Sequence, residues 1–171
     1  MRIISGSNKG KKLIMPNDKT TRPLRDMAKE SIFNILTHAK YINFHIKDCK
    51  VLDLFSGIGS FGLECISRGS KFVFFLENYA PVLKILKINI SNLKYENKSK
   101  VMEIDAFKIN NNTFEANQKF QIIFCDPPYR EKKIELLIEK IIEIDVLEKN
   151  GIIIIHRKKG DIGSYPKKFK I

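Results

Sequence analysis

The sequence lacks the features that would place this protein in a membrane or outside the cell. No stretch approaches the roughly 18 consecutive apolar residues of a membrane-spanning helix. The N-terminal residues MRIISGSNKGKKL lack the apolar segment of a secretory signal. The three cysteines, Cys49, Cys65 and Cys125, form no CxxC pair and lie in apolar runs, where cysteine usually acts as a small hydrophobic residue. We therefore expect a reduced, cytoplasmic protein without membrane contact and without a metal site.

Acidic residues are scarce at both ends of the chain. Residues 1–50 hold 11 Lys/Arg and 4 Asp/Glu, residues 51–150 hold 14 of each, and residues 151–171 hold 6 and 1. The formal net charge of +12 therefore comes entirely from the ends. A neutral centre between basic ends indicates a catalytic or binding core with extensions that grip a polyanion. A general lysine bias would give the same excess, and composition alone does not separate these two explanations.

The chain has the length of one ordinary domain and alternates between strand and helix patterns. Residues 1–24 predict a basic N-terminal β-hairpin extension around a Gly- and Lys-rich turn, and residues 25–171 predict the main domain. The expected strands are 50–55, 71–77, 100–105, 120–126 and 151–158, and the expected helices are 25–40, 60–69, 80–93 and 132–147. This alternation predicts an α/β fold, a Rossmann-like parallel sheet with helices on both faces.

A glycine-rich segment, DLFSGIGSFGLE, joins the first of these strands to the next helix. Gly57, Gly59 and Gly62 form GxGxxG between strand and helix, where glycine permits a tight turn and close approach of backbone N–H groups to a ligand. Glu77 ends the next strand, 20 residues after Gly57, where a carboxylate accepts from ribose hydroxyls. NAD(P) and S-adenosylmethionine both bind in this way.

Two further acids belong to this predicted cofactor site. Asp53 lies just before the glycine loop, where it suits a cationic ligand better than a pyrophosphate, and where it can also orient loop amides. Asp105 ends the third expected strand and is placed to accept from an adenine amino group, or is simply a solvated acid at a strand end.

The fourth expected strand ends in an unusual sequence, CDPPY. Asp126 and the carbonyl of Pro127 offer two acceptors to the two hydrogens of an exocyclic amine. Pro128 stiffens the turn, and Tyr129 can stack on a base, which is typically worth about 1–3 kcal/mol. A base within a duplex has to be flipped out to reach such a site. These residues predict methyl transfer to an amine, in which catalysis is mainly positioning and electrostatics.

At this point the sequence resembles a known family. DLFSGIGSFGLECISRG together with CDPPY is similar to the class I S-adenosylmethionine-dependent methyltransferases that act on exocyclic amines. RIISGSNKGKKL, TRPLRDMAKESIFNIL and the SRG after the glycine loop resemble the RsmD family, which methylates guanine N2 in bacterial 16S ribosomal RNA. The resemblance covers essentially the whole chain.

The resemblance implies S-adenosyl-L-methionine as cofactor, a monomer, and 16S rRNA or the assembling small ribosomal subunit as partner. The implied cofactor-binding residues are Asp53, Phe55, Ser56, Gly57, Gly59, Ser60, Glu77, Asn78, Asp105 and Ala106. The implied catalytic residues are Asp126, Pro127, Pro128 and Tyr129. Basic candidates for RNA contacts are Arg2, Lys9, Lys11, Lys12, Arg22, Arg25 and Arg130.

Two departures from the family pattern stand beside this interpretation. Leu24 follows Arg22-Pro23 where the family has threonine, and only 11 residues follow Gly160, so we expect the C-terminal antiparallel strands of the family to be incomplete. The alternatives are a DNA adenine-N6 or other amino-methyltransferase with the same core, and an RNA-binding protein that has lost catalysis. The histidines show no metal-ligand spacing, and His156 is interpreted as an ordinary strand residue.

Overall fold

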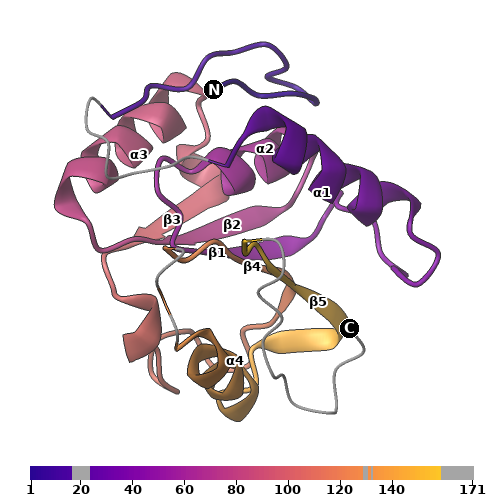
Figure 1. Cartoon of the computed structure of the whole chain (residues 1–171), viewed down its shortest axis with the longest axis vertical. Helices are drawn as coiled ribbons and strands as arrows, with labels where there is room; N and C mark the ends of the chain where they lie inside the picture. Colours follow the sequence, from indigo (N-terminus) through magenta and orange to yellow (C-terminus); the bar gives the residue numbers. More distant parts are fainter. Residues whose placement is uncertain (17–23, 129–130, 132, 159–171) are drawn as a thin grey trace.

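The computed structural model describes residues 1–16, 24–128, 131 and 133–158. Its centre is a five-stranded parallel sheet with the strand order β3-β2-β1-β4-β5 (Figure 1). The strands are β1 Lys50–Leu54, β2 Phe72–Leu76, β3 Ser99–Met102, β4 Phe120–Cys125 and β5 Leu147–Ile155. The predicted α/β fold, a Rossmann-like parallel sheet, is confirmed.

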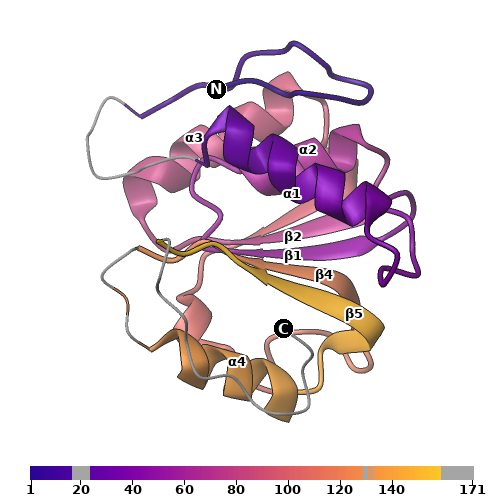
Figure 2. The ribbon, with the colours of Figure 1, turned by 45° about the vertical axis from the view of Figure 1, so that its right-hand side comes forward.

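Helices cover both faces of the sheet, as predicted (Figure 2). Three helices, α1 Asp26–His38, α2 Ser60–Ser67 and α3 Ala80–Asn92, lie on one face, and α4 Ile134–Glu143 lies on the other. Two short 3₁₀ turns, η1 Glu96–Lys98 and η2 Ala106–Lys108, flank β3. None of the helices in the described part of the chain has the length and hydropathy that crossing a bilayer requires.

The strands are apolar on both faces because both are covered. In β1, Val51 packs into the cluster under α1, α2 and α3, whereas Leu52 and Leu54 pack into the cluster under α4. The strand order reverses between β1 and β4, since the chain moves from β1 to β3 on one side and continues with β4 and β5 on the other. In such sheets ligands bind beyond the carboxyl ends of the strands at the reversal.

The boundary between α4 and β5 differs from the prediction. The helix ends at Glu143 rather than at 147, and β5 begins at Leu147 rather than at 151. The apolar spacing continues through IEIDVL, but Asp145 has a φ of 51° and takes the chain out of the helix. The expected incomplete C-terminal antiparallel strands fall on residues 159–171, which lie outside the described residues.

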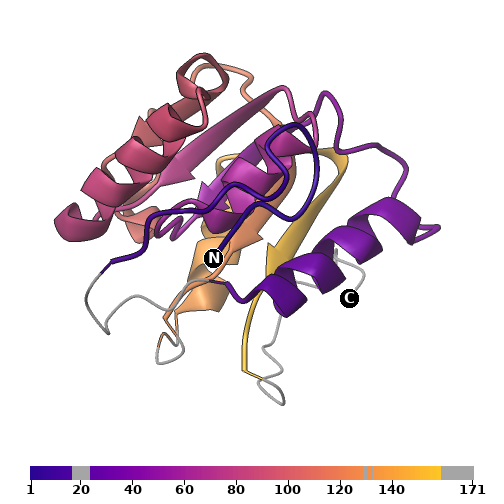
Figure 3. The ribbon, with the colours of Figure 1, turned by 90° about the horizontal axis from the view of Figure 1, so that it is seen from above.

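The N-terminal segment forms an antiparallel hairpin with a single bridge, Arg2–Lys12, rather than two full strands. Backbone hydrogen bonds extend the pairing: Ile3 N donates to the Lys11 carbonyl (2.9 Å) and Leu13 N donates to the Met1 carbonyl (3.1 Å). The hairpin crosses the outer side of the α2 and α3 layer (Figure 3). Ile3 and Leu13 are buried there and join the core, so the hairpin forms an additional layer.

All three cysteines are buried free thiols. Burial, with a smaller contribution from Asp48, raises the pKa of Cys49 to about 11. Burial likewise raises the pKa of Cys65 and Cys125 well above the ordinary thiol value. The thiols are therefore protonated at neutral pH and behave as small apolar side chains.

Candidate active site

The strand register brings the predicted site residues to one edge of the sheet. Leu54 of β1 pairs with Leu76 of β2 and with Cys125 of β4, and the outer strand pairs continue at the same level. The residues that directly follow the five strand ends therefore share this edge: Phe55, Glu77, Glu103, Asp126 and His156.

The glycine loop turns sharply at the end of β1. Phe55, Gly57 and Gly59 have φ values of 58°, 55° and 85°, in the left-handed region that glycine adopts without strain. Ser56 N donates to the Leu76 carbonyl at 3.0 Å, and Gly57 N donates to Oε2 of Glu77 at 2.8 Å. The loop is thereby tied to the end of β2, next to the start of α2.

Asp53 lies behind this loop. It is 1% exposed, and its Oδ2 accepts from the backbone N–H of Gly62 in α2 at 3.0 Å. A Cβ at Gly62 would lie 2.3 Å from the ring of Phe75, so this contact depends on glycine. Burial raises the pKa of Asp53 well above its ordinary value, and the nearby Asp126 adds to the effect, while the Gly62 hydrogen bond opposes it. In this structure Asp53 orients a backbone amide of α2.

Two further acids shape the loops after β2 and β3. Oε1 of Glu77 accepts from the amides of Asn78 and Tyr79, both at 2.9 Å. Oδ1 of Asp105 accepts from the Phe107 amide at 2.9 Å and so caps the turn η2.

Phe107 was not among the predicted site residues. Its ring lies 5.6 Å from that of Phe55, so two aromatic rings stand between the glycine loop and the loop after β3. This pairing joins residues 52 positions apart, and periodicity does not reveal it. Ala106, a predicted cofactor residue beside Phe107, is buried.

The charges at this edge suit a cation. The segments 53–60, 77–79, 105–106 and 126–128 contain four ionisable acids and no lysine, arginine or histidine, whereas the end of β5 adds His156 and Arg157. A sulfonium with an ammonium group fits this set of carboxylates, whereas a pyrophosphate would be repelled. Ser60 and Asn78 complete the predicted cofactor residues here, Ser60 buried at the start of α2 and Asn78 exposed.

Asp126 lies at the end of β4, beside the glycine loop. Its Oδ1 lies 2.8 Å from Nδ1 of His156, which directly follows β5. This hydrogen bond raises the pKa of His156, and partial burial opposes the shift. Pro127 is buried and Pro128 is exposed, while Tyr129 and Arg130 lie outside the described residues. The interpretation of His156 as an ordinary strand residue missed this pair, which the parallel alignment of β4 and β5 creates.

A buried ion pair under the hairpin was also missed. Lys29 of α1 and Glu64 of α2 are both fully buried, with Nζ 3.5 Å from Oε2. The Glu64 carboxylate accepts from the backbone N–H groups of Ile4 (2.7 Å) and Ser5 (2.9 Å) and from Arg68 Nε (2.8 Å). Burial lowers the pKa of Lys29, although the Glu64 charge acts in the opposite direction. Sequence periodicity shows only that both residues are in helices.

Further polar contacts hold the hairpin in place. Ser67 Oγ, in the SRG segment at the end of α2, donates to the Ser5 carbonyl at 2.6 Å and accepts from Asn8 N at 3.0 Å. Buried Asn89 of α3 accepts from Ile14 N at 2.8 Å and donates to the carbonyls of Ile14 and Ile58, both at 3.2 Å. Asn89 therefore connects the hairpin to the glycine loop.

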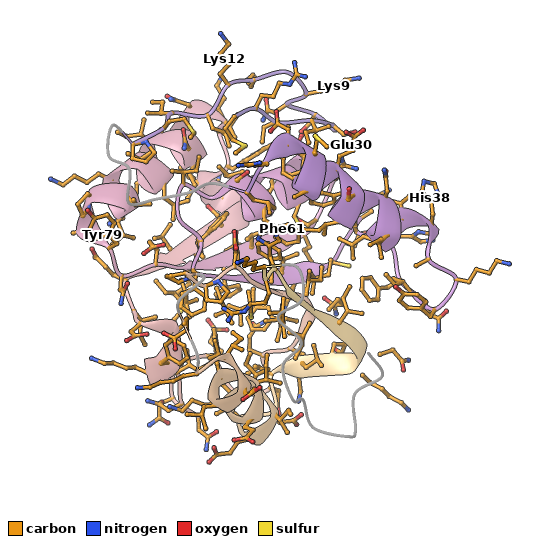
Figure 4. The ribbon with its side chains drawn as sticks, in the orientation of Figure 1. Lys9, Lys12, Glu30, His38, Phe61 and Tyr79 are labelled. Atoms are coloured by element: carbon orange, nitrogen blue, oxygen red, sulfur yellow. The ribbon has the colours of Figure 1, made fainter. Side chains whose placement is uncertain are left out.

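The basic candidates lie apart from the acidic edge. Lys9, Lys11 and Lys12 are exposed on the hairpin, and Figure 4 shows Lys9 and Lys12 pointing outward. Arg2 is exposed and lies 3.8 Å from Asp26, and Arg25 is exposed at the N-cap of α1. The remaining two candidates, Arg22 and Arg130, lie outside the described residues.

Within the described residues no group of three or more His, Cys, Asp or Glu side chains is placed to hold a metal ion. A cavity beside Phe44, Asp48 and Gln121 lies at the opposite end of the sheet and contains none of the predicted site residues.

Comparison with known proteins gives a consistent result. The model of a family described as "Conserved hypothetical protein 95" matches residues 1–171. The "Ribosomal RNA small subunit methyltransferase D" of Haemophilus influenzae is 35% identical over 165 residues, covering 93% of this chain and 79% of that protein. The protein of the same name from Escherichia coli K12 is 32% identical over 151 residues, covering 88% of this chain and 68% of that protein.

The fold agrees as well. The solved structure of the Escherichia coli protein yhhF superposes with a TM-score of 0.83 at 27% identity, covering 99% of this chain and 88% of that one. The resemblance inferred from CDPPY, the glycine loop and the N-terminal blocks is therefore confirmed over the whole chain. The chain belongs to the RsmD family of methyltransferases.

Proposed function

We propose that this protein transfers a methyl group from S-adenosylmethionine to the exocyclic N2 amine of a guanine in 16S ribosomal RNA. The observation that carries the proposal is the position of Asp126 and Pro127 at the carboxyl end of β4, next to the glycine loop that follows β1. The names of the relatives support ribosomal RNA of the small subunit as substrate.

The acidic edge supports the cofactor assignment. We propose that Glu77 and Asp105 bind the ribose and the adenine, that the loop 55–60 binds the methionine moiety, and that the Phe55–Phe107 pair forms an apolar wall; the contacts that hold these residues at the loop support this. Bound S-adenosylmethionine supplies an electrophilic methyl group. The protein's contribution is to hold the acceptor amine in line with it.

The acceptor amine of guanine is a weak nucleophile because its lone pair is delocalised into the ring. The Asp126 carboxylate and the Pro127 carbonyl are two acceptors for its two hydrogens. Hydrogen bonds to both favour a pyramidal nitrogen whose lone pair points at the methyl group. Positive charge develops on the nitrogen during transfer, and the carboxylate stabilises it. Tyr129 is proposed to stack on the base.

The hairpin is proposed to bind RNA phosphates. Lys9, Lys11 and Lys12 present exposed positive charge, and the buried contacts of Glu64 and Asn89 fix their position relative to the site. We further propose that the protein acts as a monomer in the cytoplasm. Residues 1–24 are proposed as the extension and residues 25–171 as the methyltransferase domain.

The decisive experiment is transfer of labelled methyl groups to small subunits, and separately to free 16S RNA, from a strain lacking this modification. Mass spectrometry of the product then identifies the base. Methyl-N2-guanine supports the proposal. Transfer to adenine in DNA instead would contradict it. So would RNA binding that is the same with and without S-adenosylmethionine and leads to no methyl transfer.

Asp126→Asn tests the acceptor role. We expect transfer to fall at least about a hundredfold, because losing one stabilising group of this kind costs roughly 10²–10³ in rate. Cofactor affinity should stay within about tenfold, or roughly 1.4 kcal/mol. Asp48→Asn, the same change at an exposed site with no predicted role, is the control and should leave both values unchanged. Equal losses of transfer and cofactor affinity in Asp126→Asn would move this residue to the cofactor side.

Charge removal tests the hairpin. Lys11→Gln with Lys12→Gln should weaken RNA binding and reduce the slope of log affinity against log salt by about 1–2, as loss of two phosphate contacts requires. The matched control changes two exposed lysines outside the hairpin, Lys108→Gln at the end of η2 with Lys133→Gln just before α4. An unchanged salt slope in the hairpin variant would remove the hairpin from the RNA interface.

A further inference from the structure

Asp126, the proposed acceptor, is held by a side chain from the neighbouring strand end. Nδ1 of His156 lies 2.8 Å from Oδ1 of Asp126, and the two side chains are 27% and 19% exposed. Cys125 pairs with Ile155 in the parallel register, and His156 N donates to the Cys125 carbonyl at 2.9 Å. The contact therefore rests on a backbone alignment that places these two residues side by side.

We propose that His156 is a positioning residue for methyl transfer: its neutral ring holds the Asp126 carboxylate in the orientation that accepts the target amine, and its protonation suppresses the reaction. This inference rests on the proposed function and adds to it a residue and a pH dependence. It also assigns the tautomer, because a neutral imidazole can donate to Asp126 only with its proton on Nδ1.

The reason for inhibition by protonation is electrostatic. With a neutral imidazole, Asp126 keeps its full negative charge for the positive charge that develops on the amine. With an imidazolium 2.8 Å away, that negative charge is already compensated, and the carboxylate becomes a weaker acceptor.

The charged groups on the neighbouring elements define the local field. They are Asp126 at the end of β4, Asp53 in β1, Glu131 before α4, and Arg157 beside His156 itself. Arg157 Nη2 donates to the Glu131 carbonyl at 2.8 Å, which directs this cation toward the loop before α4. The carboxylate in direct contact with the ring, on Asp126, is therefore the group that favours the imidazolium, and the raised pKa of His156 has this cause.

Two substitutions separate the hydrogen bond from the titration. In His156→Asn the amide N–H takes the place of Nδ1–H but does not titrate, whereas His156→Leu removes both properties. At pH 8 we expect His156→Asn to keep kcat within about threefold of the wild type and His156→Leu to lose at least about tenfold. The KM for RNA should change little in either variant.

The pH profile gives the second readout. Wild-type kcat should fall about tenfold per pH unit below the pKa of His156, and His156→Asn should lack this fall. His38→Asn, at the exposed end of α1, is the matched control and should retain the wild-type profile. An acid limb that persists unchanged in His156→Asn, or a His156→Leu variant with wild-type kcat, would overturn the inference.

A measurement without catalysis keeps the two proposals distinct. The pKa of His156, followed by NMR of its ring protons, should drop in Asp126→Asn, because the favourable carboxylate is lost. An unchanged pKa would sink the pairing even in an active enzyme. A dropped pKa together with no methyl transfer by the wild type to any tested substrate would instead refute the proposed function, and with it the role of His156 in transfer.

Discussion

The two faces of the sheet are closed in different ways. The face under α4 is sealed by apolar side chains, with Ile134, Leu137, Ile138 and Ile141 buried on the helix. The other face buries charged and polar groups among its apolar residues, including Lys29, Glu64 and Asn89. Within the described residues, none of the buried polar side chains belongs to α4.

The apolar face therefore mainly stabilises the fold, whereas the polar face mainly positions the hairpin. Apolar contacts are non-directional, so they hold α4 on the sheet without fixing one exact geometry. The Glu64 carboxylate accepts from backbone amides of the hairpin, and Ser67 and Asn89 donate to backbone carbonyls of the hairpin and the glycine loop, so each contact requires a particular backbone atom. The polar face therefore fixes the proposed RNA-binding hairpin relative to the glycine loop.

Removing the buried Glu64 carboxylate should cause the largest loss of stability. Glu64→Leu leaves Lys29 buried without its partner, which typically costs about 3–5 kcal/mol of unfolding free energy. Urea unfolding followed by circular dichroism measures this loss. The double variant Lys29→Met with Glu64→Leu should recover only part of it, because the buried lysine charge is removed while Arg68 and the Ile4 and Ser5 amides still lose their acceptor. A single variant within about 1 kcal/mol of the wild type would show that the pair does not matter to stability.

The apolar face should respond differently to truncation. Leu137→Ala, at a fully buried position of α4, should lower the unfolding free energy by about 3 kcal/mol, within the range for buried leucines. Leu136→Ala changes its exposed neighbour (59% exposed) and should cost less than about 1 kcal/mol. Cofactor affinity of the folded Leu137→Ala protein, measured by calorimetry, should match the wild type. A clear loss of affinity would show that α4 also positions the site.

Asn89 offers a smaller but more specific test. Asn89→Leu leaves the buried Ile58 carbonyl and the partly buried backbone groups of Ile14 without their partner and should cost about 1–3 kcal/mol. Because one of these groups belongs to the glycine loop, cofactor affinity should also fall several-fold. Asn92→Leu, at an exposed position of the same helix, is the control. Lost stability with unchanged cofactor affinity would show that Asn89 holds the hairpin without influencing the loop.

The smallest effect is the pH dependence of stability from His156. Its pKa is raised in the folded protein, so the contact with Asp126 stabilises the fold fully below the ordinary histidine pKa of about 6.5. The contribution is lost as the pH rises through the raised pKa. The melting temperature of His156→Asn should therefore be lower than that of the wild type at pH 5.5 and approach it at pH 9. A constant difference across this range would contradict the linkage.

Short-range sequence patterns predicted the elements whose position depends on neighbouring residues. The five strands, the glycine loop and the CDPPY turn follow from apolar runs and from glycine and proline at fixed spacings. The end of α4 did not, because the apolar spacing continues past Asp145 and only its backbone conformation ends the helix. The predicted roles of Tyr129, Arg22 and Arg130 remain predictions.

The sequence also did not predict side-chain pairs whose members are far apart along the chain. Lys29 lies in the amphipathic helix α1, where a charged residue is normally exposed, and Glu64 lies in α2, every residue of which is buried. The hairpin backbone contacts both side chains. His156 and Asp126 are 30 positions apart and meet only through the register of β4 and β5. Such pairs depend on tertiary geometry that single-chain periodicity does not contain.

The three buried, protonated thiols have a practical consequence for measuring motion. A maleimide dye reacts with exposed thiolates, so Cys49, Cys65 and Cys125 should remain unlabelled in the folded protein. A cysteine introduced in place of exposed Lys9 would then carry the dye alone, without removal of any native cysteine. Fluorescence from that position would follow the hairpin directly as RNA and cofactor are added.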